Sequence, residues 1–303
     1  MKRVFISTTS FAKEDSRPLS LLKEAGLNVQ INPYGRILSE DEMIGFLSDK
    51  DYLIAGTEGL NRRVLESAKN LKIISRCGVG LDNVDLESAE RFGIKVYNTP
   101  YGPTLAVAEL TVGLIMDLLR KISVMDHEIR AGKWNKQMGN LLSGKKIGII
   151  GFGRIGQRTV ELLKGFDVKI AYFDTASKKT KFSFKPLNGL LLWADIITLH
   201  CSTEGIHKPV LGKEELKKMK KGAWLINTSR GELIDEGALY LALKEGHLAG
   251  AALDVFGKEP YTGPLAELDN VILTPHVGSY AKEARIEMEI QSAQNLLKGI
   301  KGR

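Results

Sequence analysis

The sequence has only two cysteines, Cys77 and Cys201, in 303 residues. Two cysteines form no disulfide framework, which is typical of a protein in a reducing cytoplasm. Neither has a metal-ligating partner at suitable spacing, so we predict no metal site. We interpret both as small buried residues.

Long hydrophobic runs are also missing. No apolar run approaches the length of a membrane span, so we expect no contact with a membrane. The apolar part of Met1–Ser7 is too short for a secretory signal and is predicted to be a first strand. Both observations favour a cytoplasmic protein.

Clustered basic charge is scarce, although the formal net charge is +7. The densest stretch is Lys178-Lys-Thr-Lys181, which we interpret as a solvated loop. The alternative is a site for a 2′-phosphate, which the nearby Asp174 disfavours. No nucleic-acid motif is present, so the predicted partner is a small molecule.

A glycine-rich motif stands in the middle of the chain: Gly151-Phe-Gly-Arg-Ile-Gly156. It follows an apolar strand, opens a helix and precedes a second strand that ends at Asp174, which is the context of a dinucleotide site. Gly151 allows the tight turn, Gly153 lets the backbone approach a pyrophosphate, and Gly156 lets the helix pack closely. Asp174 suits a ribose diol, so we predict NAD rather than NADP.

Strand-like and helix-like segments alternate on both sides of this motif, which predicts an α/β fold of two Rossmann-like parallel-sheet domains with a cleft between them. We expect a substrate-binding domain from residues 1–100 and 280–303, with an NAD-binding domain, 101–279, inserted into it. Strands are expected at Val4–Ser7, Val29–Ile31, Tyr52–Ala55, Ile73–Ser75, Lys95–Tyr97, Ile147–Ile150, Lys169–Phe173, Ile196–Leu199, Ala223–Asn227, Ala251–Val255 and Val271–Leu273. Helices are expected at Pro18–Ala25, Ser39–Leu47, Arg62–Ala68, Leu86–Arg91, Leu105–Arg120 and Ala281–Leu297.

A polar stretch, Arg130–Ser143, follows the long apolar helix and contains Trp134. A tryptophan in a polar arm is either an interface anchor or a local cap on the core. The first interpretation fits a homodimer.

Three polar residues, Arg230, Glu259 and His276, each follow a different predicted strand. Because catalytic groups lie beyond the carboxyl ends of parallel strands, we expect the three to face one crevice.

Over nearly its whole length, the chain resembles the D-isomer-specific 2-hydroxyacid dehydrogenases. The motifs that carry the resemblance are Ser75-Arg-Cys-Gly-Val-Gly-Leu-Asp-Asn-Val-Asp85, Asn98-Thr-Pro100, Val107-Ala-Glu-Leu110, the glycine loop, Asn227-Thr-Ser-Arg-Gly231, Ala251-Ala-Leu-Asp-Val-Phe256, Glu259-Pro260 and Thr274-Pro-His276.

The resemblance implies an NAD-dependent oxidoreductase acting on the CH–OH group of a short 2-hydroxyacid. His276 would be the acid/base, Glu259 would hold its imidazole, and Arg230 would bind the substrate carboxylate and polarise the carbonyl. Substrate contacts are expected from Arg76, Cys77, Gly78, Val79, Arg230 and His276. Cofactor contacts are expected from Val79, Gly151, Gly153, Arg154, Ile155, Gly156, Asp174, Cys201, Thr228, Ser229, Asp254 and Gly278.

Within this family the chain looks most like the D-3-phosphoglycerate dehydrogenases of serine biosynthesis, so 3-phosphoglycerate is the first predicted substrate. Phosphoglycerate-using members commonly carry an arginine after the third strand, whereas this chain has Ala55-Gly-Thr-Glu58. Arg62, Arg63 and Arg76 are possible substitutes. Glyoxylate and hydroxypyruvate therefore stay open as substrates.

Two other functions are known among proteins of this fold and are alternatives to a 2-hydroxyacid dehydrogenase. Formate dehydrogenases place a glutamine where Glu259 stands, which argues against that chemistry. An NADH-sensing corepressor-like binding protein would keep the same three residues but show negligible turnover. The chain lacks tails beyond the fold, which disfavours it. For the same reason we expect no regulatory domain that responds to serine.

Overall fold

A computed structural model describes residues 1–203, 205 and 207–302, and the chain divides into two compact units. Unit 1 combines Met1–Pro103 with Ser279–Arg303, and unit 2 is the intervening Thr104–Gly278. The second unit is thus inserted into the first. The sequence predicts the two boundaries between the domains at residues 100 and 280.

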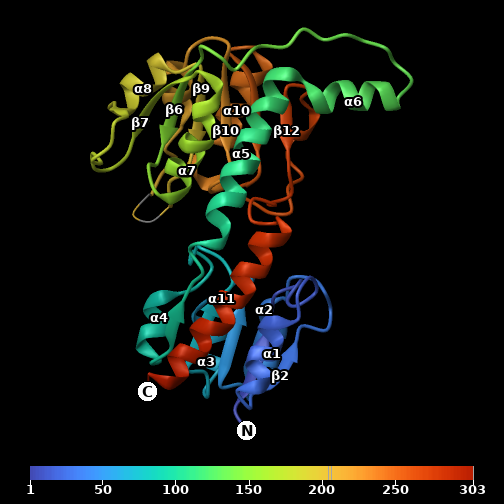
Figure 1. Ribbon diagram of the computed structural model, residues 1–303, viewed down its shortest axis with the longest axis vertical. Helices are drawn as coiled ribbons and strands as arrows, with labels where there is room; N and C mark the ends of the chain where they lie inside the picture. The colour runs from blue at the N-terminus through green and yellow to red at the C-terminus, as the bar shows by residue number, and fades with distance from the viewer. Residues whose placement is uncertain (204, 206, 303) are drawn as a thin grey trace. The chain divides into compact units, whose positions relative to one another are not determined.

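Unit 1 is built on a five-stranded sheet of order β2-β1-β3-β4-β5, in which all neighbours are parallel (Figure 1). Its strands are β1 (Arg3–Ile6), β2 (Asn28–Ile31), β3 (Tyr52–Ala55), β4 (Ile73–Arg76) and β5 (Lys95–Tyr97). Its helices are α1 (Arg17–Glu24), α2 (Glu40–Leu47), α3 (Arg62–Ser67), α4 (Leu86–Arg91) and α11 (Lys282–Lys301).

Alternate residues of the unit 1 strands enter two separate apolar cores. Val4, Ile6 and Ile54 pack with Leu22 of α1 and Met288 of α11. Phe5, Leu53 and Ile74 face the opposite side, where they pack with buried side chains of α2 and α3. Both faces of the sheet are therefore covered, as a parallel sheet requires.

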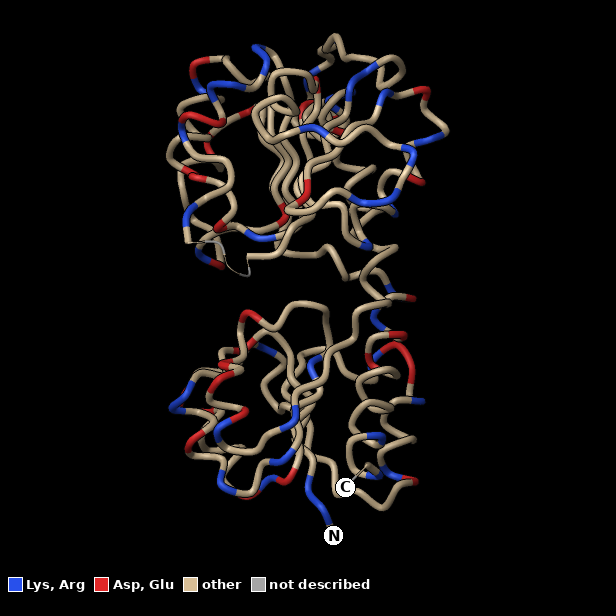
Figure 2. Tube along the Cα trace, turned by 90° about the vertical axis from the view of Figure 1, so that its left-hand side faces the viewer, with Lys and Arg blue, Asp and Glu red and all other residues tan. Residues whose placement is uncertain are grey.

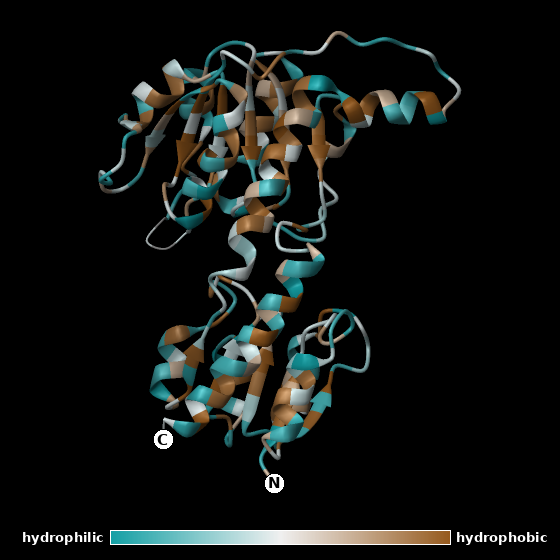
Figure 3. Ribbon diagram, viewed as in Figure 1, coloured by the Kyte–Doolittle hydropathy of each residue, from teal (hydrophilic) through white to brown (hydrophobic). Residues whose placement is uncertain are grey.

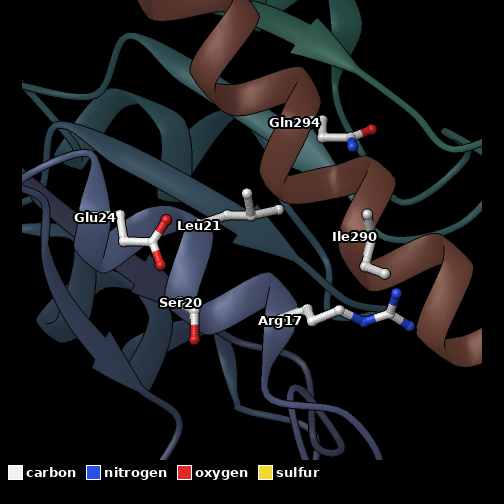
Figure 4. A pocket seen from close by; sticks show the side chains of 6 residues that line it. All are labelled: Arg17, Ser20, Leu21, Glu24, Ile290 and Gln294. Carbon is white, nitrogen blue, oxygen red and sulfur yellow. The ribbon is translucent and has the colours of Figure 1, made fainter.

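Helices α1 and α11 pack side by side on one face of this sheet. A shallow hollow of about 310 Å³ lies between them, lined by Arg17, Ser20, Leu21, Glu24, Ile290 and Gln294 (Figure 4). Arg17 forms an ion pair with Asp15 at 2.7 Å. The hollow lies between helices and not at the strand ends.

Unit 2 is built on a seven-stranded parallel sheet of order β12-β11-β10-β9-β6-β7-β8. Its strands are β6 (Lys146–Ile150), β7 (Lys169–Phe173), β8 (Ser183–Phe184), β9 (Ile196–Leu199), β10 (Ala223–Asn227), β11 (Leu248–Leu253) and β12 (Val271–Leu273). Its α-helices are α6 (Ile122–Arg130), α7 (Arg154–Leu163), α8 (Leu187–Trp193), α9 (Lys213–Lys218) and α10 (Glu236–Lys244), together with most of α5 (Gly102–Arg120). Short 3₁₀ turns occupy Lys164–Phe166, Gly231–Leu233 and Pro264–Glu267.

Two cores also enclose the unit 2 sheet, whose strands are the most apolar part of the unit (Figure 3). Helices α8, α9 and α10 bury leucines against one face, together with Ile150 and Leu225. Helices α5 and α7 cover the other face, where Leu114, Ile115 and Val160 are almost fully buried. In both units the charged residues lie mainly on the segments around the sheets (Figure 2).

Helix α5 corrects one expectation from the sequence. The helix has 19 residues, and an 18-residue window of it has a mean hydropathy of 1.5, which by length and composition is enough to cross a membrane. The expectation that no apolar run approaches that length was therefore wrong. Leu114, Ile115 and Leu119 of α5 belong to the core of unit 2, which accounts for the apolar composition.

Helix α6 was not predicted from the sequence. It begins after Lys121, whose backbone is left-handed with φ of 55°, and none of its residues is buried. It projects from the sheet of unit 2 and the chain returns through an extended segment (Figure 1). Trp134 in that segment is 80% exposed, so it does not cap the core.

Candidate active site

The strands of unit 2 end along one line across the sheet. The registers pair Phe173 with Ile150, Ile150 with Leu199, Leu199 with Asn227, Asn227 with Leu253, and Leu253 with Leu273. The segments that follow these six residues therefore leave the sheet at the same edge. They contain every site residue that the sequence predicts in unit 2 except Arg154, Ile155 and Gly156, which begin α7 next to this edge.

The strand order reverses between β6 and β9, and the glycine loop follows β6 at that point. Such a reversal is where parallel sheets bind their ligands. Gly151 has φ of 91°, and a Cβ there would lie 2.5 Å from the Cys201 nitrogen. A Cβ on Gly156 would lie 2.3 Å from the Gly151 oxygen, so α7 packs directly on the turn.

Gly153, in contrast, faces open space: apart from its two chain neighbours, none of the described residues has an atom within 4 Å of the position of a Cβ. It is also the N-cap of α7 and makes no side-chain capping hydrogen bond. The start of α7, which includes Arg154 and Ile155, is the positive end of a helix and attracts an anion. The loop fits a dinucleotide pyrophosphate.

Asp174 follows β7 beside this loop. Its Oδ2 accepts a hydrogen bond from the Phe152 N–H at 2.8 Å, and Lys178 lies 3.6 Å from its Oδ1. Burial acts to raise its pKa, but the Phe152 and Ala176 N–H groups outweigh that effect and hold it below its usual range. Asp174 therefore presents a negative charge beside the loop at neutral pH.

Arg230 is held by a turn that Asn227 organises at the end of β10. The Asn227 Oδ1 accepts the Ser229 N–H at 3.0 Å, and its Nδ2 donates to the Arg230 carbonyl at 2.8 Å. A Cβ on Gly231 would lie 1.9 Å from the Phe256 carbonyl carbon. Only glycine fits there, so the Arg230 turn lies directly against the segment that leads to Glu259.

Glu259 and His276 are brought together although they follow different strands. The Glu259 Oε2 lies 2.8 Å from the His276 Nδ1, and its Oε1 accepts the Phe256 N–H at 3.1 Å. The carboxylate thus fixes the ring through Nδ1 and leaves Nε2 for another partner. The His276 side chain is 44% exposed, so a small molecule can reach it.

The backbone of His276 is left-handed, with φ of 54°. Such a conformation costs a non-glycine residue about 1–3 kcal/mol and persists only where the surroundings hold it. Asp254 holds it here: Oδ1 accepts the Thr274 hydroxyl at 2.6 Å and the Val277 N–H at 2.8 Å, and Oδ2 accepts the Gly278 N–H at 2.8 Å.

Asp254 is fully buried, and burial raises its pKa although these three donors act in the opposite direction. The sequence assigns Asp254 to the cofactor. In the structure its side chain fixes the segment that carries His276.

His200 and Cys201 at this edge, and Cys77 in unit 1, are not suited to proton transfer. Burial lowers the pKa of His200 to about 3, so its ring is neutral, and its Nε2 lies 3.1 Å from the Thr198 hydroxyl. Burial raises the pKa of Cys77 and of Cys201 to about 11, so both remain thiols. Cys201 is only partly buried, which corrects the expectation for that residue.

Thr111 is a site residue that the sequence did not reveal. It is fully buried in α5, and its hydroxyl lies 2.9 Å from that of Thr228. A hydroxyl in the middle of a mostly apolar helix was the available signal. Asn227 and Gly231 belong to the motif Asn227-Thr-Ser-Arg-Gly231, but the sequence alone assigned neither of them a role.

The predicted substrate residues lie at the corresponding edge of unit 1: Arg76 is the last residue of β4, and Cys77, Gly78 and Val79 follow it. The Arg76 guanidinium folds over Gly78 and donates to the Cys77 carbonyl at 2.7 Å. The Cys77 N–H donates to the Ala55 carbonyl at 2.9 Å. Arg63 instead pairs with Glu40 at 2.7 Å and Asp41 at 2.8 Å, and Arg62 is exposed on α3.

Comparisons with known proteins identify the family of the chain. Residues 112–278 match the family model "D-isomer specific 2-hydroxyacid dehydrogenase, NAD binding domain". A glyoxylate reductase of Thermofilum pendens is 42% identical over 279 residues, which cover 87% of this chain and 82% of that protein. A D-3-phosphoglycerate dehydrogenase of Methanocaldococcus jannaschii is 40% identical over 276 residues and 88% of this chain, which spans about half (52%) of its length.

Solved structures are similar over the whole fold. The TT0316 protein of Thermus thermophilus superposes with a TM-score of 0.93 at 35% identity, covering 99% of this chain and 97% of that one. An acyclic imino acid reductase solved with NADPH and D-Arg superposes with a TM-score of 0.90 at 29% identity, covering 100% of this chain and 98% of that one.

The first prediction concerns Asp254. In Asp254→Asn the amide NH₂ replaces the Oδ2 that accepts from Gly278, so two donors face each other and the His276 segment shifts. We expect kcat/KM to fall about 100-fold, the order of loss that a displacement of about 1 Å causes. Steady-state kinetics measures it, and Asp269→Asn, an exposed acid in the same connection, is the control. Equal kinetics for the two variants would contradict the assigned role.

The second prediction concerns Asp174. Asp174→Ala removes the charge that would repel a 2′-phosphate, so the ratio of kcat/KM for NADH to that for NADPH should fall by about tenfold or more. Glu161→Ala, an exposed acid on α7, is the control. A ratio that Asp174→Ala leaves unchanged would show that another group selects the cofactor.

Proposed function

Because the chain belongs to the D-isomer-specific 2-hydroxyacid dehydrogenases, we propose that it reduces glyoxylate and hydroxypyruvate with NADH. The observation that carries this proposal is the 2.8 Å contact between Glu259 and His276 beside the Arg230 turn. This contact joins an acid/base to the carboxylate that orients it. The neighbouring turn carries Arg230, a cation for the substrate carboxylate, at the same edge of the sheet.

The glycine loop Gly151–Gly156 and Asp174 would hold NADH, which when bound would supply the hydride that adds to the substrate carbonyl carbon. His276 gives a proton from Nε2 to the carbonyl oxygen, and Glu259 stabilises the protonated ring through Nδ1. Arg230 binds the substrate carboxylate and polarises the carbonyl through its planar guanidinium. Its turn contacts the Glu259 segment through Gly231, so the anion site and the acid are held in fixed relation.

The names of the relatives support this choice of substrate. Glyoxylate reductases of Thermofilum pendens and Thermococcus litoralis are each 42% identical to this chain, and a hydroxypyruvate reductase of Thermotoga maritima is 37% identical. Two archaeal D-3-phosphoglycerate dehydrogenases are 40% and 34% identical. The identities to both groups are comparable, so 3-phosphohydroxypyruvate is the second candidate substrate.

A substrate panel with matched variants tests the proposal. Wild-type protein is expected to oxidise NADH with glyoxylate and hydroxypyruvate. His276→Ala should lower kcat by about 100- to 10,000-fold, the usual contribution of general acid catalysis, while NADH still binds. His247→Ala, a histidine that contacts the Leu216 carbonyl, is the control.

Glu259→Gln keeps the shape of the contact but not its charge, so it should lower kcat and change its pH dependence. Turnover that persists in His276→Ala would refute the proposed chemistry. An NADH-dependent binding protein without turnover would show no NADH oxidation with any 2-keto acid.

We also propose that the protein acts as a homodimer through α6 and the segment that follows it. Five large apolar side chains are exposed on this arm: Ile122, Ile129, Trp134, Met138 and Leu141. Such a set is typical of an interface because its burial against a second copy removes apolar surface from water.

Light scattering after size exclusion should give twice the chain mass of 33.4 kDa. Trp134→Glu, with a charge at the centre of this surface, should shift the equilibrium toward monomer, whereas Tyr34→Glu at an exposed site of unit 1 should not. A wild-type monomer at micromolar concentration would overturn the dimer.

A further inference from the structure

One turn of α5, from Val107 to Thr111, contacts both of the loops that carry Arg230 and His276. Val107 and Thr111 are four positions apart on the helix, so their side chains lie on the same face. Both residues are buried, at 7% and 0% exposed. On the side of the His276 loop, a Cβ on Gly278 would lie 3.3 Å from the Val107 Cγ2. The helix therefore packs closely against this loop and restrains it.

The contact with the Arg230 loop is a hydrogen bond whose direction follows from its partners. The Thr111 Oγ1 lies 2.8 Å from the Val107 carbonyl oxygen and 2.9 Å from the Thr228 Oγ1. Because a carbonyl oxygen only accepts, the single hydroxyl proton of Thr111 is donated to Val107. Thr228 is therefore the donor to Thr111, which fixes the orientation of the Thr228 side chain.

Thr228 is connected to Arg230 through the turn itself. It is 6% exposed and stands between Asn227 and Ser229. The Asn227 Oδ1 accepts hydrogen bonds at 3.0 Å from both the N–H and the hydroxyl of Ser229. The Arg230 Nη1 donates to the Ser229 carbonyl at 2.7 Å, so the guanidinium rests on the backbone of the turn. A shift of Thr228 would move this backbone and the guanidinium with it.

A buried threonine can also be a simple packing residue, and unit 2 contains one for comparison. Thr159 of α7 is as fully buried as Thr111, and its hydroxyl has no partner among the described residues. The Thr111 hydroxyl, in contrast, both donates and accepts, and its partner Thr228 is 117 positions away in the sequence. Separating such a pair is costly, because a buried donor is then left without an acceptor.

We propose that Thr111 is a positioning residue for the reaction and acts through Thr228. It keeps Arg230 at a fixed place relative to His276, whose loop rests on Val107 of the same helical turn. Arg230 binds the carboxylate and His276 protonates the carbonyl oxygen of one small substrate, so the separation of the two side chains must match a short 2-keto acid. This inference rests on the proposed function and adds a supporting residue to its site.

The test compares Thr111→Val, which keeps the shape of the side chain without its hydroxyl, with Thr111→Ser, which keeps the hydroxyl. Thr159→Val is the matched control, because it removes an equally buried hydroxyl that has no partner among the described residues. In Thr111→Val we expect kcat/KM for glyoxylate to fall at least about tenfold, with a lower kcat and a higher KM, since a misplacement of about 1 Å can cost about 100-fold. Thr111→Ser should recover most of this loss, and Thr159→Val should show none.

Hydrogen exchange measures the same coupling without turnover. Backbone amides of residues 227–231 should exchange faster in Thr111→Val than in wild type or in Thr159→Val. In the Thr228→Val background, Thr111→Val should cause no further loss of kcat/KM, because the hydrogen bond is already absent. Thr111→Ala and Thr159→Ala repeat the comparison if a valine variant does not fold.

Equal kinetics for Thr111→Val and Thr159→Val would overturn the inference, even if Thr111→Val has a lower Tm, because the role would then be structural only. A Thr111→Ser variant as impaired as Thr111→Val, or losses that add in the double variant, would overturn it as well. A wild type that binds NADH and reduces no 2-keto acid would refute the proposed function instead, and exchange at residues 227–231 would still test the contact.

Discussion

The parallel hydrogen-bond ladder of unit 2 is the constraint on which the active site depends. It aligns the last residues of six strands, from Phe173 to Leu273, so that residues far apart in sequence leave the sheet at one edge. The apolar cores on both faces fix this register, since a slip by one residue would move every buried side chain to the wrong face. The positions of Asp174, Arg230 and His276 follow from that register before any specific contact forms.

Specific contacts then adjust each loop, and most of them come from buried polar groups. Asn227 shapes the Arg230 turn, and Asp254 holds the left-handed backbone at His276. Each satisfies donors that would otherwise be left unpaired at a strand end, where the ladder stops. Gly231 adds the close approach that joins the Arg230 turn to the Glu259 segment. The supporting groups Asn227 and Asp254 are buried, whereas the side chains of Glu259 and His276, which they help to position, remain partly exposed.

The sequence predicted the features that depend on local pattern. Buried parallel strands are short apolar runs, so the strands that carry the site were located within a few residues. The glycine loop and the trio of Arg230, Glu259 and His276 follow from motif context and strand-end position. Helix α6 was missed because it buries no residue in the core of unit 2, and its apolar side chains, such as Ile122 and Ile129, are exposed. The supporting roles of Asp254, Asn227 and Thr111 depend on pairings between distant segments, which periodicity does not encode.

The two sheets use the same strand-end geometry but present different groups there. At the edge of unit 2, the start of α7 and the Arg230 turn suit anions. At the edge of unit 1, the segment predicted to bind the substrate carboxylate is tied to β3, because the Cys77 N–H donates to the Ala55 carbonyl at 2.9 Å. The parallel sheet therefore sets where each loop lies, whereas the side chains and N–H groups that the loops carry set what each edge can bind.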